Sequence, residues 1–304
     1  MKGLFLDADA EMAAVFEAVR EEDDPPIHVN QQPRIAADEL PRLLSGYDFI
    51  LDDHTTLPTV AMRACVGTRH VIFLGTGARS YMDPDELAGL GITVHTIKGY
   101  GDTAVAEQAI ALMWAAARGL ARMDRGVRGG AWPRTLGVQL TGKTLGLIGF
   151  GGIATEVARI ARGGGMRVIA WNRSPKSAPG VEFVGLDDLL RSSDVVSLHL
   201  LLTDETRGFL DAERIARVKP GVILVNTARG ALVDAAAMIA ALREGRLGHA
   251  ALDVYETEPL PPGHELTGLE NVTLAAHCGF YTPEANATLI RRALDIAKAI
   301  AETA

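Results

Sequence analysis

Short runs of apolar residues alternate with longer amphipathic segments along the first hundred residues of the chain. The apolar runs predict buried strands at 4–6, 27–29, 49–51, 71–74 and 92–94. The segments between them predict helices at 10–20, 36–44, 58–65 and 84–90. Because a parallel strand needs a crossover to reach its neighbour, this alternation predicts a parallel sheet covered by helices on both faces.

A long helix and a loop separate this series from a second one. Residues 102–121, rich in Ala and Leu, predict a regular helix, and the Gly- and Arg-rich stretch 126–133 predicts a loop. Further strands are predicted at 144–149, 167–171, 194–199, 221–225, 249–253 and 272–275, with helices at 152–163, 186–191, 211–217 and 234–244. Thr282 as N-cap and Pro283 in the first turn predict the start of a terminal helix. The pattern therefore predicts two doubly wound α/β domains.

Composition narrows the class of protein. The 304 residues are 48% hydrophobic and 22% charged, as in ordinary globular proteins, and the net charge of −8 argues against a nucleic-acid partner. Cys65 and Cys278 do not make a disulfide framework, which favours a reducing compartment. Asp7 and Asp9 interrupt the first apolar run, and no apolar run reaches the ~18 residues of a membrane span. We expect a cytoplasmic protein with no membrane partner.

A glycine motif joins the first strand of the second series to its helix. The segment 145–154 reads Leu-Gly-Leu-Ile-Gly-Phe-Gly-Gly-Ile-Ala, a G-x-G-x-x-A pattern. Gly149 allows a tight turn, Gly151 leaves room for a pyrophosphate, and Gly152 and Ile153 offer helix N-terminal N–H groups to it. A glycine turn without a ligand and a site for S-adenosylmethionine are the alternatives. The strand–turn–helix context favours a dinucleotide.

The end of the next strand bears on which dinucleotide binds. An NAD site usually has Asp or Glu at this point, to bond the ribose hydroxyls. This chain has Asn172, Arg173, Ser174 and Lys176, which would accept a 2′-phosphate that a carboxylate would repel. The sequence therefore favours NADP(H), with NAD(H) as the alternative if Arg173 stacks on adenine and Lys176 is only solvated.

Charged groups follow the last three predicted strands. Arg229 lies in Asn-Thr-Ala-Arg-Gly at 226–230, Glu258 in Asp-Val-Tyr-Glu-Thr-Glu-Pro at 253–259, and His277 follows the final strand. The carboxyl ends of parallel strands are where open α/β sheets bind ligands. A cation, a carboxylate and an imidazole there suit carbonyl chemistry on an anionic substrate. No metal site is indicated.

These segments, with Val-Ala-Glu at 105–107 and Ser-Leu-His at 197–199, closely resemble the D-isomer-specific 2-hydroxy acid dehydrogenase family, in its glyoxylate and hydroxypyruvate reductase branch. The resemblance covers nearly the whole chain. It implies that Arg229 binds the substrate carboxylate and polarises the oxo group, and that His277, paired with Glu258, exchanges the proton. Taken singly, each of these residues has an ordinary structural interpretation. Their joint presence in the family's order favours catalysis.

The resemblance also implies the remaining contacts. Asp253, Thr203 and Thr227 would contact the cofactor, and Thr76, Gly77 and Ala78 would hold the substrate carboxylate. Gly152 departs from the family, since many relatives have Arg there. Cys278 would line the site and make it sensitive to oxidation. Two further side chains are interpreted as structural or exposed: Trp132 as core or interface packing and Arg79 as a loop cation.

The family architecture sets the expected domains and partners. A flavodoxin-like substrate domain spans 1–99, and the helix 280–304 returns to it. A Rossmann dinucleotide domain spans 100–279, and the helix 102–121 with its following loop builds a homodimer. The expected function is D-isomer-specific hydride transfer between a nicotinamide cofactor and a small anionic 2-oxo or 2-hydroxy acid. The alternatives are an NAD-dependent dehydrogenase of another acid, such as 3-phosphoglycerate, and a non-catalytic cofactor sensor.

Overall fold

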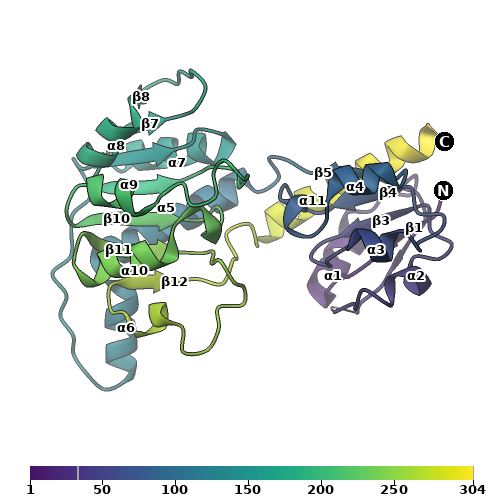
Figure 1. Cartoon of the computed structure of the whole chain (residues 1–304), viewed down its shortest axis with the longest axis horizontal. Coiled ribbons are helices and arrows are strands. Elements are labelled where there is room, and N and C mark those ends of the chain that lie inside the picture. The colour runs from purple at the N-terminus through teal and green to yellow at the C-terminus, as the bar shows by residue number, and fades with distance from the viewer. Residues whose placement is uncertain (33, 304) are drawn as a thin grey trace. The chain divides into compact units, whose positions relative to one another are not determined.

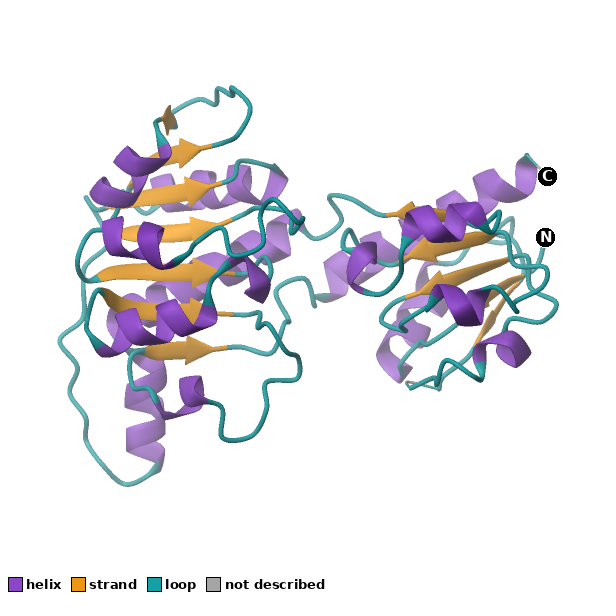
Figure 2. Cartoon of the chain, viewed as in Figure 1, coloured by secondary structure: helices purple, strands orange, loops and turns teal. Residues whose placement is uncertain are grey.

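The computed structural model describes residues 1–32 and 34–303. The chain forms two compact units, Met1–Gly101 with Tyr281–Ala304, and Asp102–Phe280 (Figure 1). Each unit has one sheet with helices on both faces (Figure 2). The predicted α/β class is therefore confirmed.

The sheet of the first unit has the order β2-β1-β3-β4-β5, with every strand pairing parallel. This is the order of flavodoxin-like folds. The strands match the five apolar runs: β1 Gly3–Phe5, β2 Ile27–Val29, β3 Phe49–Asp52, β4 His70–Phe73 and β5 Thr93–Thr96. Their carboxyl ends, and the loops that follow them, lie at one edge of the sheet.

Helices cover both faces of this sheet. On one face α1 Ala10–Val19 packs beside α11 Pro283–Glu302, whose first turn is capped by the Thr282 side chain as predicted. The other face is covered by α2 Leu40–Leu43, α3 Thr59–Met62 and α4 Pro84–Gly89. The predicted helix 36–44 is wrong in its first half. The Glu39 carboxylate accepts the Ala36 N–H there and forms a turn instead, and Pro41 fits only the first turn of a helix.

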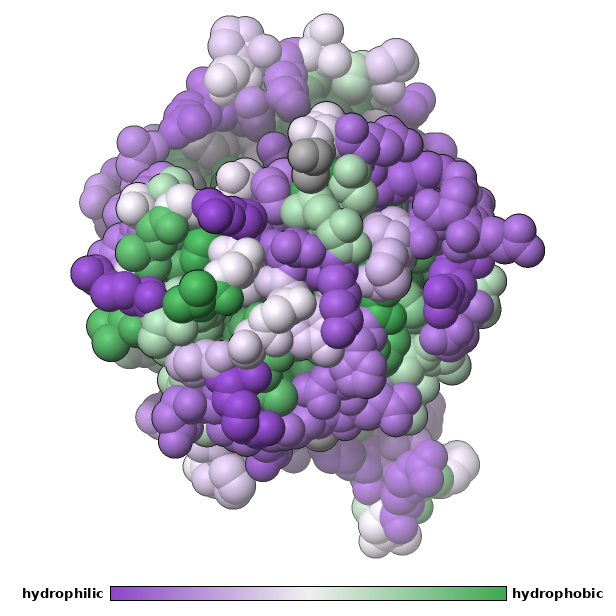
Figure 3. All heavy atoms as spheres, turned by 90° about the vertical axis from the view of Figure 1, so that its right-hand side faces the viewer, coloured by the Kyte–Doolittle hydropathy of each residue, from purple (hydrophilic) through white to green (hydrophobic). Residues whose placement is uncertain are grey.

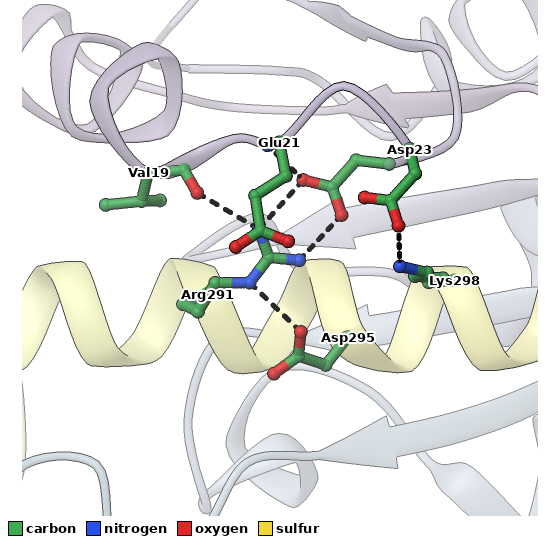
Figure 4. Close-up of polar contacts among 7 residues, drawn as sticks. Val19, Glu21, Asp23, Arg291, Asp295 and Lys298 are labelled. Carbon is green, nitrogen blue, oxygen red and sulfur yellow. Dashed lines mark hydrogen bonds and ion pairs between the residues drawn. The ribbon is translucent and has the colours of Figure 1, made fainter.

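An ion-pair cluster fastens α11 to the segment after α1 (Figure 4). The Arg291 guanidinium donates to both carboxylate oxygens of Asp24, at 2.8 and 2.6 Å, and to the Val19 carbonyl. It also pairs with Asp295 on its own helix, and Lys298 pairs with Asp23. The Asp24 side chain is only 2% exposed, so this pair is a buried anchor and not a surface contact.

The sheet of the second unit has the order β12-β11-β10-β9-β6-β7-β8, again with parallel pairing. This is the Rossmann order continued by one strand, and it places a topological switch point between β6 and β9. The strands are β6 Thr144–Ile148, β7 Arg167–Trp171, β8 Glu182–Phe183, β9 Val195–Leu198, β10 Val222–Asn226, β11 Leu247–Leu252 and β12 Val272–Leu274. The sequence did not predict β8, because two residues are too few for a periodic pattern.

Two helix layers cover this sheet. On one face α5 Asp102–Arg118 packs against α7 Gly152–Gly163. The opposite face is covered by α8 Leu186–Ser192, α9 Ala212–Arg217 and α10 Ala235–Arg243. Short 3₁₀ turns are η1 Ala78–Ser80, η2 Gly230–Leu232 and η3 Glu265–Gly268.

The predicted helix 102–121 is interrupted. Gly119 has φ 63°, and a Cβ atom there would lie 2.8 Å from Thr135 Cγ2, so the chain turns at Gly119 and a separate helix α6 Leu120–Arg128 begins. The predicted loop at 126–133 therefore starts only after Arg128. All residues of α6 are described and none is buried. Apolar side chains remain exposed on α6 and after it: Leu120, Val127, Trp132, Leu136 and Val138.

Within the described residues no helix is both long and apolar enough to cross a membrane. The face of the molecule drawn in Figure 3 is mainly hydrophilic, with scattered apolar patches. Cys65 and Cys278 are both free thiols.

Candidate active site

His277 and Glu258 form the centre of the candidate site. Glu258 lies in the loop after β11, and His277 follows β12, so the two come from neighbouring strand ends. His277 Nδ1 lies 2.6 Å from Glu258 Oε2, and Glu258 Oε1 accepts the Tyr255 N–H at 2.8 Å. About a third of each side chain is exposed, 30% for His277 and 33% for Glu258. The pair is thus held by the protein yet open to a ligand.

The surroundings of Glu258 favour its charged form. Burial acts to raise its pKa, but hydrogen bonds from His277 and the Tyr255 N–H, with the positive charges of His277 and Arg229, outweigh burial and hold the pKa below its ordinary value. An ionised Glu258 accepts a proton-bearing Nδ1 from His277. That contact leaves Nε2 of the imidazole for a reacting group.

The backbone of His277 is held in an unusual conformation. Among the described residues it is the only non-glycine with positive φ, at 53°. The buried Asp253 carboxylate accepts the N–H groups of Cys278 at 3.1 Å and Gly279 at 2.8 Å, and the Asp253 carbonyl accepts the His277 N–H at 2.7 Å. Such strain costs roughly 1–3 kcal/mol and persists only when neighbouring contacts impose it. Asp253 therefore positions the imidazole through its turn.

Arg229 is positioned by a buried asparagine at the end of β10. Asn226 is 1% exposed; its side-chain amide donates to the Arg229 carbonyl at 2.9 Å, and its oxygen accepts the Ala228 N–H at 3.0 Å. A Cβ atom at Gly230 would lie 2.0 Å from the Tyr255 carbonyl carbon, so only glycine lets the turn approach the Glu258 loop. This approach brings the Arg229 charge close enough to act on Glu258.

Sequence reasoning missed two positioning residues, Asn226 and Tyr255. The Tyr255 hydroxyl donates to the Ala275 carbonyl at 2.6 Å, which ties the end of β12 to the Glu258 loop. Burial, with the charges of Asp253 and Glu258, raises the pKa of Tyr255 to about 12 and keeps it a donor. Asn226 lies in the motif at 226–230 and Tyr255 in the motif at 253–259, and this position was the only feature of the sequence that could have identified them.

The glycine loop has the geometry that a dinucleotide needs. Gly149 has φ 87°, and a Cβ atom there would lie 2.6 Å from the His199 carbonyl oxygen. A Cβ atom at Gly151 would enter open space, and α7 begins directly afterwards with no side-chain cap. Open space beside uncapped helix N–H groups is a cradle that fits a pyrophosphate.

The loop after β7 is fastened to the glycine loop. The Asn172 side chain accepts the Phe150 N–H at 3.1 Å and donates to the Ser174 carbonyl at 2.8 Å, and Lys176 Nζ donates to the Phe150 carbonyl at 2.5 Å. Arg173 pairs with Glu205 at 2.8 Å, and both side chains are largely exposed. Asn172 and Lys176 therefore shape the cradle, while Arg173 can exchange its partner at little cost.

The other residues predicted to contact the cofactor or the substrate are Thr203, Thr227 and the loop at 76–78. The Thr203 N–H donates to the Thr206 hydroxyl at 2.7 Å within an exposed turn. The Thr227 hydroxyl is buried and has no partner among the described residues. Thr76, Gly77 and Ala78 follow β4 and belong to the first unit, whereas every other site residue belongs to the second.

The structure also describes the surroundings of Trp132 and Cys278. Trp132 is 81% exposed, so the alternative that it packs in this chain's core is wrong. Cys278 is exposed, and its Sγ lies 3.7 Å from the Asp253 carboxylate.

Comparison with known proteins places this geometry in a family. Residues 110–279 match the family model described as D-isomer specific 2-hydroxyacid dehydrogenase, NAD binding domain. The chain is 47% identical over 208 residues to a glyoxylate reductase of Aeropyrum pernix, an alignment that covers 64% of this chain and 62% of that protein. It is 38% identical to a hydroxypyruvate reductase of Thermotoga maritima, over 82% of this chain and 83% of the relative.

A solved structure agrees over the whole chain. The TT0316 protein of Thermus thermophilus superposes with a TM-score of 0.90 at 33% sequence identity, covering 100% of this chain and 97% of that one. This structure supports the fold, and the family suggested by the sequence motifs is confirmed by the family model that matches more than half of the chain and by the Thermotoga relative. The chain belongs to the D-isomer specific 2-hydroxyacid dehydrogenase family.

Proposed function

We propose that this protein is a nicotinamide-dependent reductase of small 2-oxo acids, with glyoxylate and hydroxypyruvate as the first candidate substrates. The observation that carries the proposal is the 2.6 Å contact between His277 Nδ1 and Glu258 Oε2, next to Arg229 on the adjoining strand end. The printed names of the Aeropyrum and Thermotoga relatives support the choice of substrates. For hydroxypyruvate and other acids that give a chiral product, family membership predicts the D-isomer, whereas the product of glyoxylate is achiral.

Each of the three charged residues has a distinct task. Arg229 is a permanently charged planar fork that binds the substrate carboxylate and draws electron density from the neighbouring oxo group. The imidazole of His277 gives the proton on Nε2 to the carbonyl oxygen, and takes it back when the hydroxy acid is oxidised. Glu258 positions His277 and stabilises its charged form. A reduced nicotinamide supplies the hydride to the carbonyl carbon when it is bound.

The second unit would hold the cofactor. The pyrophosphate fits the open space at Gly151 and the first turn of α7, which starts at Gly152 and Ile153. Thr203 and Thr227 would contribute hydroxyl groups. Within the described residues Asp253 Oδ1 accepts from Cys278 and Gln108, whereas Oδ2 accepts only the Gly279 N–H, so Oδ2 is the oxygen that would bind the nicotinamide carboxamide.

We further propose that the cofactor is NADP(H). The loop after β7 offers Asn172, Arg173, Ser174 and Lys176 and no carboxylate at the ribose position. The Arg173–Glu205 pair is exposed, and such pairs contribute about 0–1 kcal/mol, so Arg173 can leave it for a 2′-phosphate. Arg173→Ala should lower the preference for NADPH over NADH, measured as the ratio of the two kcat/KM values, by about tenfold.

The first unit would supply the substrate loop. Thr76, Gly77 and Ala78 follow β4 at the carboxyl edge of its sheet, and their backbone N–H groups can receive a carboxylate. A homodimer would bury the apolar side chains that α6 and its following loop expose, chiefly Leu120, Trp132 and Leu136. Leu136→Asp should shift the sedimentation coefficient from a dimer to a monomer if this surface is the interface.

The test of the reaction is the initial rate of NADPH and NADH oxidation with glyoxylate, hydroxypyruvate, pyruvate, phenylpyruvate and 3-phosphohydroxypyruvate. Turnover with NADPH ahead supports both proposals, and turnover with NADH ahead retains the reductase and rejects the cofactor choice. Tight cofactor binding without turnover of any acid would favour a sensor. His277→Ala should abolish turnover while cofactor affinity survives, because the imidazole acts on the substrate.

A further inference from the structure

The first turns of α5 and α7 meet at a single carboxylate. Asp102 begins α5 and Gly152 begins α7. A Cβ atom built on Gly152 would lie 1.8 Å from Asp102 Oδ2 and 2.7 Å from its Cγ. The carboxylate of Asp102 therefore occupies the space that any side chain at position 152 would need. A Cβ atom on the preceding Gly151 meets nothing within 4 Å.

The position of this carboxylate bears on the pyrophosphate cradle. The first N–H groups of α7 have no intrahelical partner, and α7 has no side-chain cap. The positive ends of α5 and α7 both favour a negative charge here. A dinucleotide pyrophosphate bound at the same helix start would carry its own negative charges beside Asp102.

We propose that Asp102 is an affinity-limiting residue of the dinucleotide site: its carboxylate favours the cofactor-free state at the start of α7 and opposes the pyrophosphate by like-charge repulsion. The inference rests on the proposed function, because it takes the ligand to be a nicotinamide dinucleotide. Asp102 would therefore weaken cofactor binding, whereas an ordinary binding residue strengthens it. Glycine at position 152 is a condition of this arrangement, since Asp102 fills its side-chain space.

Two readouts should move in opposite directions in Asp102→Asn. The substitution removes the negative charge that lies near the N-termini of both α5 and α7, which should lower the Tm of the cofactor-free protein by about 1–3 °C. Loss of the repulsion should tighten NADPH binding by about three- to tenfold at low salt, and by less at high salt, where charges near solvent are screened. A residue that only stabilises the fold would lower the Tm and leave affinity unchanged or weaker.

Asp188→Asn is the matched control. Asp188 is another carboxylate in the first turn of a helix, α8, of the second unit, and its substitution changes the net charge equally. It should leave the NADPH dissociation constant within about twofold of the wild type, because α8 packs on the face of the sheet opposite α7 and salt screens exposed charges. The assay is fluorescence titration with NADPH and NADH at two ionic strengths, which needs no turnover.

A double-mutant cycle tests the packing without any cofactor. Gly152→Ala places a methyl group against the carboxylate, so it should lower the Tm more in the wild-type background than in Asp102→Ala. Equal effects in both backgrounds would overturn the packing that the inference requires.

The binding outcomes separate this inference from the proposed function. Tighter binding in Asp102→Asn alone supports the inference, and unchanged or weaker binding with intact wild-type binding overturns it while the reductase proposal stands. If neither the wild type nor any variant binds NADPH or NADH, the proposed function fails and this inference fails with it. The double-mutant cycle still reports whether Asp102 occupies the space at Gly152.

Discussion

Replacing Glu258 with glutamine is the sharpest test of the catalytic pair. The two carboxylate oxygens accept from different partners, His277 Nδ1 at 2.6 Å and the Tyr255 N–H at 2.8 Å. Glutamine has one acceptor oxygen, so Glu258→Gln can keep only one of these contacts and places an amide N–H against the other donor. The variant also removes the negative charge that favours the protonated imidazole.

The expected size of the effect follows from the geometry. Hydrogen bonds to charged groups contribute about 1.5–3 kcal/mol when buried. About a third of each partner is exposed, so solvent weakens the contact and roughly 1–2 kcal/mol remains. Glu258→Gln should therefore lower kcat/KM for reduction of the oxo acid near neutral pH by about 5- to 30-fold.

The pH profile separates this role from a general loss of structure. Reduction needs a proton on Nε2 of His277, and Glu258 holds the imidazole through Nδ1, so Glu258→Gln should lower the maximum of kcat/KM. The pKa of Glu258 is depressed, so in the wild type the carboxylate's contribution is present above its usual range and is lost as pH falls through the depressed value. The variant should lack that acidic decline.

Initial rates from about pH 4 to 10, a range that spans the ordinary pKa values of carboxylates and imidazoles, decide between these roles, with cofactor affinity and Tm as controls. An acidic decline of kcat/KM that persists unchanged in the variant would refute the role of the Glu258 charge. Equal kcat/KM in variant and wild type at all pH values would refute the catalytic assignment of the pair altogether.

Three further predictions concern stability and positioning. Arg291→Met leaves the buried Asp24 carboxylate without its bidentate partner and should lower the unfolding free energy measured in urea by about 2–4 kcal/mol. The hydrogen bond to Arg291 is the chief cause of the lowered pKa of Asp24, so this loss of stability should shrink as pH falls through that lowered pKa. A loss that does not change with pH would indicate that packing alone is responsible. Asp52 is fully buried without a hydrogen-bond partner among the described residues, and burial, then the charges of Asp7 and Asp53, raise its pKa well above the usual value. The buried carboxyl therefore destabilises the folded state increasingly as pH rises from the pKa of Asp52 in the unfolded chain towards its pKa in the folded chain. Asp52→Asn should raise the Tm more at about pH 8 than at about pH 4, and an unchanged Tm at about pH 8 would contradict the raised pKa of Asp52. Gly230→Ala forces a methyl group onto the Tyr255 carbonyl and should lower kcat/KM by at least about tenfold with cofactor affinity retained, a result that unaltered kinetics would rule out.

Local patterns in the sequence were sufficient for the fold class. Each apolar run of the first unit forms a strand. The central strands β1, β3 and β4 are the buried ones, and a strand buried on both faces must be apolar along its length. The glycine motif at 149–154 lies between β6 and α7, since the tight turn and the close helix packing require small residues there. The order of motifs after β10, β11 and β12 was also sufficient to indicate the family.

Contacts between distant segments decided the rest. A single glycine within a helical pattern is compatible with a continued helix or with a helix end, and only the structure shows that the helix ends at Gly119, with Thr135 packed beside it. The left-handed backbone of His277 depends on Asp253, which lies 24 positions earlier and holds the following N–H groups.

At Gly152 the sequence predicts one feature of the site and only the tertiary structure reveals another. Its sequence context predicts a helix start beside a phosphate, and only the packing of α5 on α7 reveals that Asp102 fills the adjoining space. Sequence periodicity determines which face of an element is buried, because burial follows the geometry of a single helix or strand. Which groups meet across two elements depends on how both pack, and this tertiary packing decided the positions of the charged groups in the candidate site.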